Sequence, residues 1–175
     1  IEKTQSKIAT KQVNPMTFEE EKRFKEYLIN DSHPYRNLVL IELYTGMRLG
    51  EALALDISDI DIKSDTIRVS KILTHDENHK PYIHDSTLSQ TKDGARLVQI
   101  NDAFKNNVIE AIRIAETNEN NKEKLLFCQD NGSLILESSV NSYLKRVAKE
   151  IGLSYWKQFS SHRLRHTFAT RCIEA

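Results

Sequence analysis

The sequence lacks long apolar runs and contains only two cysteines, Cys128 and Cys172. No stretch approaches the ~20 consecutive apolar residues that a bilayer span needs, which excludes a helical membrane protein. Two cysteines cannot form a disulfide framework, so we expect a reducing compartment. The first residues, IEKTQ, contain neither an initiator Met nor the apolar core of a signal peptide. We therefore expect the chain to be a piece of a longer protein.

The chain also lacks net charge, because 25 Lys and Arg residues balance 25 Asp and Glu residues. Taken alone, this balance argues against a nucleic-acid partner, which usually requires a basic domain. The charges are unevenly distributed, however. Residues 51–65 contain five acids and one base, whereas residues 140–175 contain seven bases and two acids. The C-terminal excess is compatible with a positive binding face, and a solvated charged surface is the alternative.

A helical pattern is present, and a strand pattern interrupts it in the middle of the chain. Apolar residues make up 39% and charged residues 29%, which is typical of one globular domain. We predict an α+β fold that is mostly α-helical, with one small three-stranded antiparallel sheet. Periodicity and capping signals predict helices near residues 17–29, 34–46, 49–55, 101–116, 138–151 and from 162 onward. A Thr17–Glu20 capping box, Asn101, and Ser138 or Ser139 are expected to start the first, fourth and fifth of these helices. The second helix is apolar on nearly every side and is expected to be central. The strands are expected at 66–70 and 96–100, with a third strand from 81–89 between them.

The last predicted helix has two distinct faces. His162, Arg165 and His166 are three or four residues apart and therefore share one face, close to the start of the helix. An N-terminal helix end favours anions, and the planar fork of arginine matches two phosphate oxygens. This face is suited to a phosphate group. The opposite stripe is apolar and is expected to be buried: Leu164, Phe168 and Cys172.

Metal binding is a weaker interpretation of the histidines. The spacing of His162 and His166 resembles a zinc-protease helix, but Arg163 occupies the position where such a helix needs a glutamate base. Three more histidines lie in a polar segment with no standard ligand spacing: His75, His79 and His84. We therefore expect no metal site.

Two further positions are candidates for chemistry. Arg48 follows a helix that Gly46 ends, and Glu51 lies three residues later; burying an arginine there is costly unless it is paired or binds an anion. A purely structural Arg48–Glu51 ion pair is the alternative. Lys92 lies in a predicted hairpin turn, where it would either be exposed and inert or be delivered to a site by the loop.

Three motifs together resemble one family, the tyrosine recombinases or phage integrases. TGMRLGEALAL at 45–55 is similar to the box around their first catalytic arginine, and SHRLRHTFAT at 161–170 is similar to their His-x-x-Arg box. QTKDGAR at 90–96 resembles the hairpin turn that carries their lysine. The resemblance covers residues 14–175, so residues 1–13 are interpreted as a linker from a missing N-terminal DNA-binding domain.

The resemblance implies DNA strand cleavage and rejoining through a 3′-phosphotyrosine intermediate, with no metal and no cofactor. Arg48 and Arg165 would stabilise the charge on the phosphate oxygens, because two guanidinium forks can replace a metal ion. Lys92 would protonate the leaving 5′ oxygen, and His162 would assist proton transfer and phosphate binding. Two residues would support these groups without reacting: Glu51 and His166.

The nucleophilic tyrosine is missing from the expected place. All six tyrosines precede His162, whereas the family's pattern places the nucleophile after it. We therefore expect the nucleophile beyond Ala175 and expect this fragment not to cleave DNA by itself. The resemblance implies double-stranded DNA as the partner, a tetramer of the full-length protein on DNA, no membrane association and a cytoplasmic, nucleoid-associated location. Two alternatives are a non-cleaving, regulatory DNA-binding relative and a structural helical domain.

Overall fold

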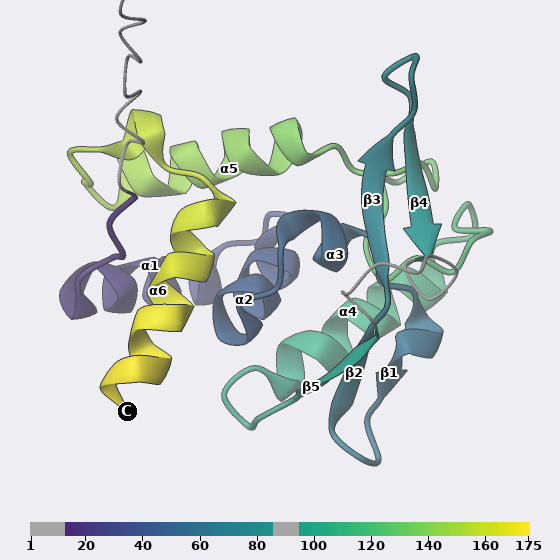
Figure 1. Ribbon diagram of the computed structural model, residues 1–175, viewed down its shortest axis with the longest axis horizontal. Helices are drawn as coiled ribbons and strands as arrows, with labels where there is room; N and C mark the ends of the chain where they lie inside the picture. The colour runs from purple at the N-terminus through teal and green to yellow at the C-terminus, as the bar shows by residue number, and fades with distance from the viewer. Residues whose placement is uncertain (1–12, 86–94) are drawn as a thin grey trace, which may run out of the picture.

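The computed structural model describes residues 13–85 and 95–175, and helices form most of it (Figure 1). The predicted α+β fold, mostly helical with a small antiparallel sheet, is confirmed. Six α-helices are present in this part of the chain: α1 (Phe18–Asn30), α2 (Arg36–Thr45), α3 (Leu49–Leu53), α4 (Lys105–Thr117), α5 (Glu137–Glu150) and α6 (Ser161–Glu174). Across the described residues, none of these helices combines the length and apolar composition that crossing a membrane requires. The expected linker over 1–13 lies almost wholly outside the described residues.

Helix α2 is the central element of the core. Its residues from Leu38 to Ile41 are at most 2% exposed, because the segment is apolar on every face. Helices α1, α3, α4 and α6 all pack against α2. Gly46 ends the helix in the left-handed conformation, with φ of 62°. The sequence prediction of a central second helix that stops at this glycine is confirmed.

The strands form two separate antiparallel units. Strands β1 (Ile60–Asp61), β2 (Thr66–Val69) and β5 (Arg96–Gln99) make a three-stranded sheet in the order β1-β2-β5. Strands β3 (Lys71–His75) and β4 (Pro81–Asp85) form a hairpin of their own, which projects away from α6 in Figure 1.

A strand does form at 81–85, within the predicted range of 81–89. Its expected membership of the three-stranded sheet was wrong, because it pairs with β3 and the third strand of that sheet is β1. The reason is the short turn between β3 and β4, in which the Asp76 carboxylate accepts hydrogen bonds from the Asn78 and Lys80 amides. Alternation along a strand shows which face is buried, whereas the turn chooses the partner strand.

Helix starts were predicted with mixed success. The capping box of α1 is confirmed, with Thr17 and Glu20 exchanging hydrogen bonds. Helix α5 follows Leu136, so the serines expected to cap it lie inside its first turn. Asn101 accepts a hydrogen bond from the Ala103 amide and forms a turn four residues before α4. Cys172, which was expected on the buried stripe of the last helix, is instead exposed.

Candidate active site

Arg48 and Arg165 line one cavity of about 260 Å³, together with His162. Arg48 directly precedes α3, whereas His162 and Arg165 lie in the first turns of α6. The structure thus brings the two predicted boxes together from distant parts of the sequence. The remaining lining residues come from α2, α3, β3, α5, the start of α6 and one loop: Glu42, Met47, Leu49, Gly50, Ile72, Glu137, Asn141 and Ser161.

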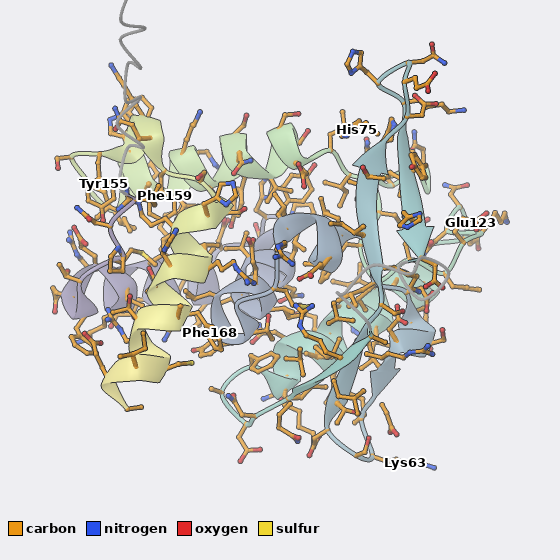
Figure 2. The ribbon with its side chains drawn as sticks, viewed as in Figure 1. Lys63, His75, Glu123, Tyr155, Phe159 and Phe168 are labelled. Atoms are coloured by element: carbon orange, nitrogen blue, oxygen red, sulfur yellow. The ribbon has the colours of Figure 1, made fainter. Side chains whose placement is uncertain are left out.

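A direct contact ties the two boxes to each other. The Nη1 of Arg165 donates a hydrogen bond to the backbone oxygen of Gly46, 119 positions away in the sequence. A Cβ atom added at Gly46 would lie 2.2 Å from Cδ1 of Phe168, so the absence of a side chain lets α6 approach α2. Phe168 is labelled on α6 in Figure 2. The glycine therefore serves both the left-handed turn and the close packing that places Arg165 beside Arg48.

Glu51 is held between two arginines. Its carboxylate accepts hydrogen bonds from the Arg48 amide at 2.8 Å and from Arg48 Nη1 at 3.3 Å. Arg96 makes the better contact, a bidentate pair at 2.9 and 2.7 Å. Burial raises the pKa of Glu51, but the bonds from Arg96 and Arg48 outweigh it and hold this pKa below its usual value. Glu51 therefore stays ionised near neutral pH.

The Arg48–Glu51 ion pair proposed as the structural alternative is present, yet it does not bury Arg48. The Arg48 side chain is 53% exposed, and Arg96 makes the shorter contact with the Glu51 oxygens. Sequence reasoning missed Arg96. It is the last residue of the motif at 90–96. The signal that the sequence offered was a charged residue at the start of a predicted strand.

The other predicted site residues have different outcomes. His162 is exposed and lines the cavity, as expected. His166 is exposed on α6 but does not line the cavity, so the structure does not bring it to the two arginines. Lys92 lies outside the described residues. Strand β5 begins at Arg96, whose bond to Glu51 anchors the start of this strand to the box around Arg48.

Fewer basic side chains of the C-terminal region, residues 140–175, can bind an anion than their number suggests. Arg163 is buried, lies 4.2 Å above the Tyr155 ring and donates a hydrogen bond to the Asn14 oxygen. Arg171 pairs with Glu21 at 2.7 Å, and a second carboxylate on α6 also binds it. Two of the seven bases thus stabilise the fold. Three others are exposed on α5: Lys145, Arg146 and Lys149.

None of the six tyrosines, all of which lie in the described part of the chain, lines the cavity. The Tyr143 hydroxyl donates to Asp31 at 2.7 Å, and burial raises its pKa. The Tyr155 hydroxyl donates to Glu20 at 2.8 Å, and burial with this bond raises its pKa to about 12. Figure 2 shows Tyr155 and Phe159 beside the start of α6. Phenols held in this way are poor nucleophiles.

Two other features of the molecule bear on the choice of site. Within residues 13–85 and 95–175, no group of three or more His, Cys, Asp or Glu side chains is arranged to hold a metal ion. A cavity of about 500 Å³ lies beside the C-terminal half of α4 and is lined in part by Phe127 and Cys128. It contains none of the predicted site residues, so the smaller cavity with Arg48 and Arg165 is the candidate active site.

The chain is similar to known proteins over nearly its whole length. The sequence profile of the Phage integrase family matches residues 14–175. The chain belongs to the phage integrase family. An integrase of Staphylococcus phage L54a is 26% identical over 187 residues, covering 99% of this chain and 51% of that protein. A tyrosine recombinase XerC-like protein of Caldanaerobacter subterraneus subsp. tengcongensis is 27% identical, covering 97% of this chain and 46% of its own length.

Solved structures of integrases share the fold. The Tn1549 transposon integrase, in complex with transposon right-end DNA, superposes with a TM-score of 0.79 at 23% identity. That match covers 95% of this family member and 55% of the Tn1549 chain. The XerA recombinase matches with a TM-score of 0.69. The chain thus spans about half the length of the curated relatives it matches.

Proposed function

We propose that this chain is part of a site-specific tyrosine recombinase that integrates or exchanges double-stranded DNA, with residues 14–175 forming most of its catalytic domain. The observation that carries the proposal is the placement of Arg48 and Arg165 on one cavity beside His162. Two guanidinium groups in one cavity are suited to the paired oxygens of a phosphodiester. The relatives named as integrases, and the Tn1549 integrase with transposon DNA, support DNA as the substrate.

In the proposed reaction, a tyrosine oxygen attacks the scissile phosphorus and forms a 3′-phosphotyrosyl bond while the bond to the 5′ oxygen breaks. Lys92 gives its proton to the leaving 5′ oxygen, which departs as a hydroxyl. Arg48 and Arg165 stabilise the charge that builds on the non-bridging oxygens. His162 binds the phosphate and assists removal of the tyrosine proton. Attack by a 5′ hydroxyl reverses the step and joins the strands, so no nucleotide cofactor is consumed.

Two neighbouring groups position Arg48 and Arg165 in this proposal. Glu51, held by Arg96, fixes the backbone amide and the guanidinium of Arg48. The Gly46 oxygen accepts from Arg165 and orients it toward the same cavity. Removing one donor to a developing oxyanion typically lowers the rate by about 10²–10³. We expect losses of this size for Arg48→Ala and Arg165→Ala in the complete recombinase.

We also propose that a tyrosine outside these 175 residues supplies the nucleophile, because the six present lie away from the cavity. The chain, mixed with a nicked suicide DNA substrate, is expected to form no covalent adduct on a denaturing gel. A phosphotyrosyl adduct would contradict this assignment. The tetramer on DNA, and the linker role of residues 1–13, remain part of the same proposal.

DNA binding by the chain tests the site directly. Fluorescence anisotropy with a short duplex should show weaker binding for Arg48→Ala and Arg165→Ala. Each lost phosphate contact should also reduce the slope of log affinity against log salt by about 0.9. Arg113→Ala is the matched control, because Arg113 is exposed on α4 and does not line the cavity. Equal affinities for the control and both site variants would refute a phosphate site here.

A non-cleaving DNA-binding relative is the second candidate, since it too is consistent with the described residues placing no tyrosine on the cavity wall. Both candidates predict the same binding results. The longer reading frame separates them: a protein extended past residue 175 that binds the duplex but never forms an adduct with the suicide substrate would support the non-cleaving candidate.

A further inference from the structure

Glu42 is a buried carboxyl group at the candidate active site that the proposed reaction does not use. It lies on α2, is 0% exposed and lines the same cavity as Arg48 and Arg165. Neither of its oxygens makes a hydrogen bond of ordinary geometry with the described residues. Buried polar groups are nearly always hydrogen-bonded, so an unpartnered carboxyl on a cavity wall needs an explanation.

The charged groups around Glu42 do not neutralise it by pairing. Arg165 donates to the Gly46 oxygen and Arg48 to Glu51, so each cation of the cavity already has another acceptor. His162 on α6 and Glu137 on α5 also face the cavity. No salt bridge joins Glu42 to any of these groups in the part of the chain that the structure describes.

Burial raises the pKa of Glu42 to about 8; the Ser161 hydroxyl opposes the rise and the negative charge of Glu137 adds to it. At neutral pH the group is therefore mostly a neutral carboxylic acid. In that form it has one O–H donor, which the nearby Ser161 hydroxyl does not receive in a hydrogen bond of ordinary geometry. A phosphate oxygen in the cavity would supply the missing acceptor.

We propose that Glu42 is an additional phosphate-binding residue, a neutral acid that donates its O–H to an oxygen of the bound phosphodiester. The inference rests on the proposed function, because it requires DNA phosphate in this cavity. A neutral acid adds a donor without adding a third positive charge. Enzymes use the same device where an acid is kept protonated in an apolar site so that it can donate to a developing oxyanion.

Ionisation of Glu42 would then oppose binding for two reasons. The donor is lost, and a carboxylate and a phosphate would share one cavity, where like charges repel. Because only the protonated form is competent, the apparent dissociation constant is the intrinsic one divided by the protonated fraction. Phosphate binding should therefore weaken as the pH rises through about 8, by about tenfold at pH 9 relative to pH 7.

The experiment compares duplex affinity from pH 6.5 to 9.5, at fixed ionic strength, for the 175-residue chain and Glu42→Gln. Glutamine keeps a donor but does not titrate. The ratio of the two affinities cancels the effect of every other group, because those groups are present in both proteins. We expect this ratio to change about tenfold between pH 7 and 9, and to stay constant below pH 7. A constant ratio over the whole range would overturn the proposal.

A second measurement does not depend on the variant folding. The side-chain carboxyl of Glu42 can be titrated by carbon-13 NMR in the unaltered chain, with and without saturating duplex. Linkage requires bound phosphate to raise its pKa, and an unchanged or lowered pKa would refute the assignment. The double variant Arg48→Ala, Arg165→Ala separates the two proposals. If it binds as well as the unaltered chain, the phosphate site itself is wrong; if it loses binding while Glu42 shows no linkage, only the role of Glu42 fails.

Discussion

Replacing Arg96 by alanine should destabilise the fold, although no catalytic role is assigned to this residue. The substitution removes two charge-assisted hydrogen bonds, of 2.9 and 2.7 Å, from a Glu51 carboxylate that is 6% exposed. Such bonds contribute about 1.5–3 kcal/mol each when shielded from water. Because the Arg96 side chain is 43% exposed and Arg48 still binds Glu51, we expect a net loss of about 2 kcal/mol.

Urea denaturation followed by circular dichroism measures this loss. With a slope of about 2 kcal/mol per molar urea, the midpoint should fall by about 1 M. The difference should depend on pH in a defined direction. Since the pKa of Glu51 is lowered in the folded state, its stabilisation is complete above the ordinary value of 4.5 and is lost as the pH falls through the folded-state value. The gap between the two proteins should therefore close under acid conditions.

Arg68→Ala is the matched control for Arg96→Ala. Arg68 is exposed on β2, directly opposite Leu97 of β5, and makes no ion pair with the described residues. Its replacement should change stability by less than about 0.5 kcal/mol. If both variants have the same midpoint, or if the effect of Arg96→Ala persists unchanged at pH 3, then Arg96 does not stabilise the fold through the ionised Glu51 carboxylate.

Three more predictions concern the packing of the two boxes, a buried tyrosine and the binding of DNA. In thermal unfolding, Gly46→Ala should lower the free energy of unfolding by at least about 1 kcal/mol more than Gly152→Ala. Both glycines have positive φ, but only a Cβ atom at position 46 would collide with Phe168, so adding Phe168→Ala should remove the difference. Tyr143→Phe should cost about 1–2 kcal/mol by removing the 2.7 Å hydrogen bond to Asp31, and exposed Tyr82→Phe on β4 is the control. Duplex affinity should fall steeply with salt while differing little between sequences, and a flat salt response would contradict phosphate binding.

Local features of the sequence were sufficient to predict where the helices lie and to recognise the two motifs at 45–55 and 161–170. The Thr17–Glu20 capping box and the glycine stop at Gly46 depend on neighbouring residues only, and both were predicted correctly. Strand pairing was predicted less well, because a turn several residues away selects the partner of 81–85. The burial of Arg163 was missed for a related reason: the aromatic rings and the carbonyl that receive it belong to other segments.

By itself, the sequence determined the family, the mostly helical fold and the catalytic candidates Arg48, His162 and Arg165, since residue type and spacing within two short motifs carry that information. The tertiary structure decided which of these groups meet. It brought Arg165 to the Gly46 oxygen, made Arg96 the main partner of Glu51, and left His166 outside the cavity. It also placed Glu42 at the site, which no spacing could indicate. Contacts between residues more than 100 positions apart depend on how whole helices pack, and helix packing is set by the core and not by any local motif.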